Sequence, residues 1–300
     1  MNMQPFCGAP DRARMLALAR LCPAENVHTI DLPYRLASWA LDSPDNVALW
    51  TDGDGRLLAW AVLQTPFWNL DVCLHPDAPA DAYATALAWA GTRAGQLPEG
   101  LRRPAWFVPV LARQTARRRA LEAAGWADQA EGADDEPWSQ VIYRREGQEP
   151  ALRVALRPGF AIRPLADDEV PAYVALHRAV FESENMTEGW RAATLAAPGR
   201  RPAFDLAATD PSGNLAAFAV GWWGEVDGRA VAQIEPFGVR ADARRYGLAW
   251  ALMFELLGRF RQAGAAEVLV LTDRYRDAAN AFYQGCGFVP AEDVRIYRCG

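Results

Sequence analysis

The sequence predicts an α/β protein of two tandem domains, each a mixed, mostly antiparallel sheet flanked by helices on both faces. The segment GRLLAWAV at Gly55–Val62 resembles GNLAAFAV at Gly213–Val220. Further along, LEAAGW ending at Trp126 resembles YQGCGF ending at Phe288. The copies keep the same order and nearly the same spacing, and so long a period indicates a duplicated domain and not a solenoid repeat. Apolar alternation and helical periodicity follow one another through the second copy.

A charged stretch with two prolines separates the copies. Residues 144–159 read RREGQEPALRVALRPG, and the prolines together with the final glycine disfavour regular structure there. We therefore predict a first domain at residues 1–145, a linker at 146–158 and a second domain at 159–300.

Composition excludes several classes of function. The net charge of −6 and the pI near 5.2 lack the basic footprint of a nucleic-acid-binding protein. No apolar run approaches the ~20 residues of a membrane span, and the start lacks a signal-peptide layout, so we expect a cytoplasmic protein. The five cysteines form no C-x-x-C pair, so no zinc site or disulfide framework is expected. Lysine is absent, which excludes a P-loop lysine and Schiff-base chemistry.

Each element of the second domain follows from a local pattern. The expected elements, in order, are a strand at 160–165, helices at 169–181 and 187–196, a hairpin at 203–223, a strand at 229–239, a helix at 246–264, a strand at 266–272, a helix at 276–288 and a final hairpin at 288–299. Pro236 predicts a bulge or an unpaired edge in its strand. The continuous apolar run at 266–272 predicts a strand buried on both faces.

An anion-binding loop is predicted between the strand at 229–239 and the helix that follows it. The free N–H groups and the positive dipole end of a helix start attract anions. Gly247 has no Cβ to keep a phosphate away, and Arg244 and Arg245 add positive charge. Taken alone, the pattern is equally compatible with an ordinary helix start that carries solvated arginines.

The context of this loop resembles the GNAT superfamily of N-acyltransferases. The family pattern [RQ]-x-x-G-x-[GA] lies between a bulged fourth strand and a long helix, and RRYGLA at 244–249 matches it. The late pattern Y-x-x-x-G-F is matched by Tyr283, Gly287 and Phe288. The resemblance implies acetyl-CoA as donor, with pyrophosphate on the loop and pantetheine along Phe237–Val239. The implied donor-binding residues are Phe237, Gly238, Val239, Arg244, Arg245, Tyr246, Gly247, Leu248 and Ala249.

One position departs from the family pattern. Where the family often has an asparagine that touches pantetheine, this sequence has Arg276. Asn280 lies one helical turn later on the same face, so we expect Asn280 to make that contact. Whether Asn280 or Arg276 does so stays open.

The resemblance implies direct attack of an amine on the thioester. An alkylamine with a pKa of about 10.4 is mostly protonated at neutral pH, so a base is needed. Glu235 is the candidate base, acting through a water, and the alternative is a solvated strand-edge glutamate. Tyr283 is the candidate acid for the leaving thiolate, and the alternative is a packed aromatic. A backbone N–H near Val239 is expected to stabilise the oxyanion.

The segment FESENMTEGW at 181–190 is acidic and lies where this family shapes its acceptor pocket. Its glutamates Glu182, Glu184 and Glu188 hint at a cationic acceptor, although solvated surface is the simpler interpretation.

The first domain lacks the donor motifs. Aligned on the second domain, Pro79 stands for Arg244, Asp81 for Tyr246 and Ala82 for Gly247. A carboxylate repels pyrophosphate and proline removes a donor. Leu121 stands for Tyr283. We expect this domain to be structural and to help shape the acceptor cleft.

Together these observations predict an N-acetyltransferase that moves an acetyl group from acetyl-CoA to a primary amine of a small molecule. The alternatives are a catalytically silent acyl-CoA-binding protein and an acetyltransferase for peptide or protein amines. No metal, nucleic-acid or membrane partner is expected.

Overall fold

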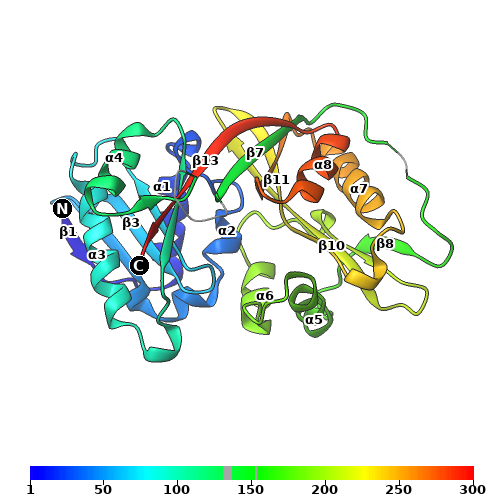
Figure 1. Cartoon of the computed structure of the whole chain (residues 1–300), viewed down its shortest axis with the longest axis horizontal. Coiled ribbons are helices and arrows are strands. Elements are labelled where there is room, and N and C mark those ends of the chain that lie inside the picture. The colour runs from blue at the N-terminus through cyan, green and yellow to red at the C-terminus, as the bar shows by residue number, and fades with distance from the viewer. Residues whose placement is uncertain (131–136, 153) are drawn as a thin grey trace.

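A single twisted sheet runs through the whole molecule (Figure 1). The computed structural model describes residues 1–130, 137–152 and 154–300. Its strands are β1 (Asn2–Gln4), β2 (Val47–Thr51), β3 (Leu57–Gln64), β4 (Asn69–Leu74), β5 (Trp106–Leu111), β6 (Ala127–Asp128), β7 (Ser139–Glu146), β8 (Ala161–Pro164), β9 (Asp205–Thr209), β10 (Leu215–Val226), β11 (Arg229–Val239), β12 (Glu267–Asp273) and β13 (Val289–Cys299). Its helices are α1 (Ala9–Ala19), α2 (Leu32–Arg35), α3 (Ala82–Gln96), α4 (Thr115–Ala123), α5 (Val170–Phe181), α6 (Glu188–Leu195), α7 (Leu248–Gln262) and α8 (Asp277–Gly285).

The strand order repeats between the halves. From one edge the sheet runs β1-β2-β3-β4-β5-β13, and from the other edge β8-β9-β10-β11-β12-β7. In each half the first four strands pair antiparallel, and the fourth and fifth pair parallel. The two series join where β13 pairs antiparallel with β7. The predicted α/β class, with two tandem arrangements of mixed, mostly antiparallel strands, is therefore confirmed.

The closing strands of the two halves are exchanged. β7 pairs with β12 of the second half, whereas β13 pairs with β5 of the first half. Figure 1 accordingly shows both termini in the lobe formed by the first half. The final hairpin predicted at 288–299 is wrong, because one continuous strand is needed to reach across to β5. The boundaries drawn at residues 145 and 159 stay a prediction.

Two cores hold the second half and join it to the first. The apolar face of α7, including Leu252 and Phe260, packs on one face of the sheet with Cys286. On the opposite side, Tyr34 and Ile30 of the first half pack among Trp190 and Trp222 of the second half. Because this second core contains residues from both halves, it fixes the relative position of the two lobes.

A parallel pair of strands separates in the middle of the second half. β11 and β12 pair only where Val231–Gln233 faces Glu267–Leu269. Beyond this point the register of β11 on β10 also shifts at Glu235 and Pro236, as the bulge predicted from Pro236 requires. The strands then diverge and leave a gap at the level of Glu235.

Candidate active site

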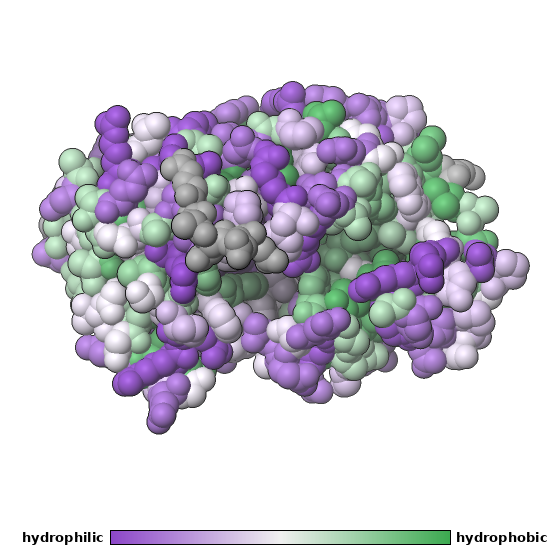
Figure 2. Space-filling view, in the orientation of Figure 1, coloured by the Kyte–Doolittle hydropathy of each residue, from purple (hydrophilic) through white to green (hydrophobic). Residues whose placement is uncertain are grey.

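A cleft of about 830 Å³ occupies the gap between β11 and β12 and extends to the first half. The space-filling view shows the surface hollowed between the two lobes (Figure 2). The donor-loop residues Arg244, Arg245, Gly247, Leu248 and Ala249 line it, together with Glu235, Phe237, Gly238, Val239 and Tyr283. The structure therefore brings most of the predicted site residues to one cavity.

The start of α7 presents a row of free amides. Gly247 is the N-cap residue with φ 79°, and Arg245 before it also has a positive φ of 66°. The amides of residues 245–250 have no hydrogen-bond acceptor among the described residues. Successive amides turned to one side by such a backbone form an anion-binding concavity.

Side chains around this loop divide into two groups. Arg244 and Arg245 are exposed and line the cleft. Tyr246 instead packs against Phe160 and lies under the Arg157 guanidinium, 4.6 Å from the ring centroid, outside the residues that line the cleft. The Tyr246 side chain therefore does not line the cleft, and only its backbone amide belongs to the row of free amides.

The edge of β11 offers backbone groups to the same cleft. The Arg240 amide donates to Ala216 on β10, and successive residues of a strand point their amides to opposite sides. The amide of Val239 therefore points away from β10, into the gap left by β12. Gly238 packs so closely on Val180 that a Cβ would lie 2.4 Å from it.

Glu235 lies at the bulge of β11 with its side chain on the cleft. Its carboxyl has no hydrogen-bond partner among the described residues, while Trp222 Nε1 donates to its backbone oxygen at 2.7 Å. Burial, with a contribution from Asp31, raises the pKa of Glu235 to about 8; Arg35 and Arg276 oppose the shift, and Asp273 adds to it. A carboxylate with such a pKa is a far stronger base than an ordinary glutamate.

Tyr283 faces Glu235 from α8. Its ring packs near Tyr143, Phe282 and Phe288, and its hydroxyl has no hydrogen-bond partner among the described residues. Burial, and next the nearby Glu235 carboxylate, raise the pKa of Tyr283 well above its usual value. The hydroxyl therefore stays protonated and available as a donor.

Asn280 is not brought to the cleft. Its amide nitrogen donates to the carbonyls of Asp273, Arg274 and Arg276, and its oxygen accepts from the Tyr143 hydroxyl at 3.0 Å. These bonds fix the loop before α8. Arg276 lines the cleft and is paired with Asp273 at 2.8 Å. The geometry gives no support to a pantetheine contact by Asn280, which stays a prediction.

The far wall of the cleft comes from the first half, and sequence reasoning named none of its residues. These are His28, Asp31, Tyr34, Arg35, Phe67 and Asn69, joined by Gln140 of β7 and by Trp138 just before that strand. The one feature of the sequence that could have indicated this wall is the high density of polar side chains in HTIDLPYR at 28–35.

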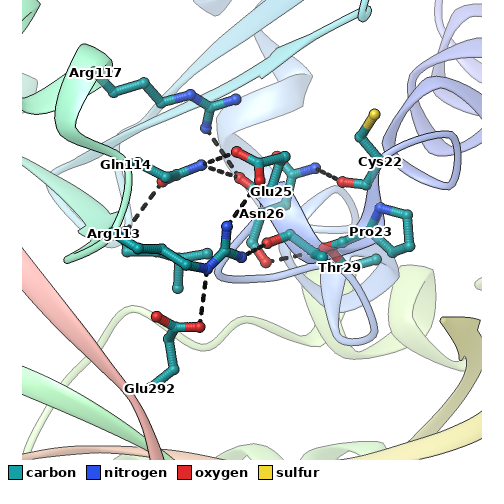
Figure 3. Close-up of polar contacts among 11 residues, drawn as sticks. Cys22, Pro23, Glu25, Asn26, Thr29, Arg113, Gln114, Arg117 and Glu292 are labelled. Carbon is teal, nitrogen blue, oxygen red and sulfur yellow. Dashed lines mark hydrogen bonds and ion pairs between the residues drawn. The ribbon is translucent and has the colours of Figure 1, made fainter. Parts of the chain in front are cut away.

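A polar network holds this wall in place (Figure 3). Arg113 binds Glu25 and Glu292 at 2.8 and 3.0 Å, and also the carbonyl of Ala24. Gln114 donates to both the side chain and the carbonyl of Glu25. Burial opposes ionisation of Glu25, but the bonds from Gln114 and Arg113 outweigh it and lower its pKa. The loop that carries His28 and Asp31 is thereby tied to the first half and to β13.

The glutamates of the acidic segment at 181–190 lie on the surface. Glu182, Glu184 and Glu188 are exposed, and Glu184 pairs with Arg178 at 2.8 Å. None of the three lines the cleft. The simpler interpretation, solvated surface, is the one observed.

The described residues contain no cluster of metal-ligating side chains, and none of the helices described has the length and apolar run needed to cross a bilayer.

Comparison with known proteins identifies the fold and one domain. Residues 164–288 match the acetyltransferase (GNAT) family. A tandem GNAT protein from the clavulanic acid biosynthesis pathway is 15% identical, with a TM-score of 0.68 over 99% of this chain and 98% of that chain. A GCN5-related N-acetyltransferase from Sphaerobacter thermophilus is 20% identical, with a TM-score of 0.63 over 99% and 95%.

Saccharomyces cerevisiae N-myristoyltransferase with bound myristoyl-CoA is 10% identical, with a TM-score of 0.62 over 99% of this chain and 78% of that chain. A search of curated proteins found no match. At these identities the solved structures establish the fold alone.

Proposed function

Since residues 164–288 form a GNAT acetyltransferase domain within a tandem GNAT fold, we propose that the protein is an N-acetyltransferase that acetylates a primary amine of a small molecule. One observation carries the proposal: the unpaired carboxyl of Glu235 and the hydroxyl of Tyr283 line the same cleft as the free amides that start α7. A base, an acid and an anion site thus share one cavity.

The donor in this proposal is acetyl-CoA. Its pyrophosphate lies on the amides of residues 245–250, flanked by Arg244 and Arg245, and its pantetheine follows the open edge of β11 at Phe237–Val239. Each charge-assisted hydrogen bond contributes about 1.5–3 kcal/mol, so a few of them hold a diphosphate firmly. The Val239 amide, which points into the gap, is placed to donate to the thioester oxygen.

The acceptor amine attacks the thioester carbon directly. Glu235 takes a proton from the amine, a carbon–nitrogen bond forms and the carbon–sulfur bond breaks with its electron pair on sulfur. Tyr283 donates a proton to that thiolate. The raised pKa of Glu235 reduces the mismatch with an amine of pKa about 10.4, which an ordinary carboxylate near 4.3 leaves much larger.

A small acceptor fits the cleft better than a protein segment does. The first-half wall at His28, Tyr34 and Phe67 closes the side of the cavity opposite the donor loop. A folded protein or long peptide needs an open groove there.

The test combines stoichiometry and turnover. Calorimetric titration with acetyl-CoA is expected to give one site per chain. Release of free CoA thiol from acetyl-CoA is then followed with a panel of small primary amines. We expect kcat/KM to rise up to pH about 8 as Glu235 loses its proton, and Glu235→Gln to lose about 100-fold in kcat while keeping that binding.

The possible results separate the alternatives. Binding without amine-dependent thiol release would indicate a silent acyl-CoA-binding protein, and release with peptides alone would indicate a protein or peptide acceptor. If no site for acetyl-CoA is found, the enzyme proposal is wrong. In Glu235→Gln, the remaining pH dependence of kcat/KM should reflect only the ionisation of the acceptor amine.

A further inference from the structure

The first-half wall of the cleft contains charged groups that the acyl transfer itself does not use. Arg35, Asp31 and His28 come from the segment just before and within α2. The ion pairs and hydrogen bonds that these side chains form determine whether an acceptor meets a positive or a negative charge at this wall.

The arginine of this wall is already neutralised. Arg35 Nε and Nη2 donate to the two oxygens of Asp71 at 2.9 and 2.8 Å, and both side chains are buried. Gln64 also donates to Asp71 at 3.0 Å. A paired guanidinium of this kind is not free to bind a carboxylate of the acceptor.

The arginine on the opposite wall is neutralised in the same way. Arg276 pairs with Asp273, whose other oxygen accepts hydrogen bonds from Trp138 and Gln140. The cleft beyond the donor loop therefore has no arginine without a carboxylate partner among its described lining residues.

Asp31 has no arginine ion pair among the described residues. Its side chain is 1% exposed, lies on the cleft, and contacts one partner among the described residues, His28 Nδ1 at 3.0 Å. A buried carboxylate needs a compensating charge or several hydrogen bonds. Asp31 and Glu235 therefore face one cavity as two carboxyl groups. The charges of Arg35 and Arg276 act on Glu235, and that of Arg35 also acts on Asp31, but among the described residues neither arginine forms an ion pair with either carboxyl group.

Tyr34 supplies a second, independent observation at this wall. The residue is 3% exposed, and its ring is fixed by stacking on Trp190 at 5.1 Å. It lines the cleft, yet its hydroxyl has no hydrogen-bond partner among the described residues. A hydroxyl that reaches the cleft from a side chain fixed in this way is positioned to exchange a hydrogen bond with a ligand atom there.

We propose that the acceptor is a small diamine, whose reacting amine faces Glu235 and whose second, cationic amine sits on Asp31 within reach of the Tyr34 hydroxyl. This inference rests on the proposed function. Tyr34 and Phe67 line this end of the cleft beside Asp31. An amino acid does not fit, because its carboxylate would meet Asp31 and find both arginines occupied.

Three acceptors of equal chain length test the second group alone. Putrescine, butylamine and γ-aminobutyrate carry the same reacting amine, followed by a cationic, an apolar and an anionic end. We expect kcat/KM for putrescine to exceed that for butylamine by about 10–100-fold, the range for a charge-assisted hydrogen bond, and γ-aminobutyrate to be the poorest acceptor. The affinities of putrescine and butylamine for CoA-loaded protein are measured in parallel by calorimetry.

Two variants assign the preference to the proposed residues. Asp31→Asn keeps the shape and removes the charge, so the putrescine-to-butylamine ratio should fall towards one, mainly through KM. Tyr34→Phe keeps the ring on Trp190 and should lower the ratio a few-fold. Asp54→Asn, an exposed charge change elsewhere in the first half, is the matched control and should leave the ratio as in the parent.

The results distinguish failure of the proposed diamine site from failure of the proposed acetyltransferase activity. Acetylation of butylamine as efficient as that of putrescine, or a preference that survives Asp31→Asn, would overturn the diamine site while the acetyltransferase stands. Asp31-dependent binding of putrescine without any acetylation would support the site and overturn the proposed function. Neither acetylation nor selective binding would overturn both.

Discussion

The two halves have the same strand order and differ in what fills the space between the fourth and fifth strands. In the second half, β11 and β12 open into a cleft of about 830 Å³. In the first half, a pocket of about 40 Å³ lies between β4 and β5, walled by Tyr83, Trp60 and the loop at residues 25–28. The loop at residues 25–28 thus occupies, in the first half, the place that we propose for acetyl-CoA in the second half.

The helix starts differ as sharply. Gly247 and Arg245 have positive φ values and free amides, whereas Asp81 at the start of α3 has φ −89° and a carboxylate. Leu121 is fully buried where Tyr283 faces the cleft. The comparison teaches that the same strand order accommodates an open cleft in one half and a small pocket in the other, and that the first half contributes a wall to the cleft of the second.

The largest effect is expected from reversing the helix-start difference. Gly247→Glu places a carboxylate at the proposed pyrophosphate site and a side chain at φ 79°, so acetyl-CoA affinity should fall about 1,000-fold by calorimetry. Ala80→Glu adds the same charge to the exposed loop before α3 and should change neither affinity nor stoichiometry. A second acetyl-CoA site, or a loss of acetyl-CoA affinity in Ala80→Glu, would contradict the proposed difference between the two halves.

The buried base of the second half should make stability depend on pH. The pKa of Glu235 is about 8 in the folded chain against a usual 4.5, so the folded state holds this proton more tightly. Its stabilisation is complete below pH 4.5 and is lost as pH rises to about 8. Between these limits the free energy of unfolding should fall by roughly 2–5 kcal/mol more in the parent than in Glu235→Gln.

Denaturant unfolding across this pH range measures the difference, because all other titrating groups, including Asp31, Arg35, Arg276 and Asp273, are common to both proteins. Glu225→Gln, on an exposed part of β10, is the control and should follow the parent. Parallel curves for the parent and Glu235→Gln would contradict the buried, raised-pKa carboxyl.

The tyrosines of the two pockets should differ in function. Tyr283→Phe removes the proposed proton donor, so kcat should fall roughly 100-fold while acetyl-CoA affinity is kept. Tyr83→Phe makes the same change beside the small pocket of the first half and should leave kcat as it is. Steady-state kinetics with a saturating amine decides, and unchanged turnover in Tyr283→Phe would remove it from the mechanism.

The smallest effect is expected at the network that holds the wall. Arg113→Met breaks the ties to Glu25 and Glu292 but leaves the cleft residues unchanged. Since exposed ion pairs contribute about 1 kcal/mol or less, KM for the amine should rise only a few-fold, with kcat and acetyl-CoA affinity retained. A fall in acetyl-CoA affinity instead would show that the network supports the donor site.

Local signals accounted for most of the second half and its donor loop. Gly247, Pro236 and the Tyr283 pattern predicted a helix start, a bulge and a helix end, because each depends on backbone conformation near one residue. The resemblance drawn from these motifs is confirmed for residues 164–288, which match the acetyltransferase (GNAT) family. Roles assigned to single side chains remain proposals.

What the sequence left out depends on contacts between distant segments. The repeat shows that two similar halves exist, but strand pairing between β13 and β5 has no local signature, so the last strand was taken for a hairpin. Asp31 and Tyr34 meet Glu235 only because the halves share a core around Trp190 and Trp222. Helical spacing favours Asn280 for the pantetheine contact but does not reveal that its side-chain amide already donates to backbone carbonyls.

The exchange of β7 and β13 also sets the order in which the molecule can be completed during synthesis. β5 ends at Leu111, and the strand that covers its free edge begins only at Val289. Until those residues leave the ribosome, the nascent first half exposes an unpaired edge next to a finished sheet, the kind of edge that recruits other strands. The two lobes should therefore fail as separately expressed fragments and reassemble when co-expressed, each fragment supplying the strand that the other lacks.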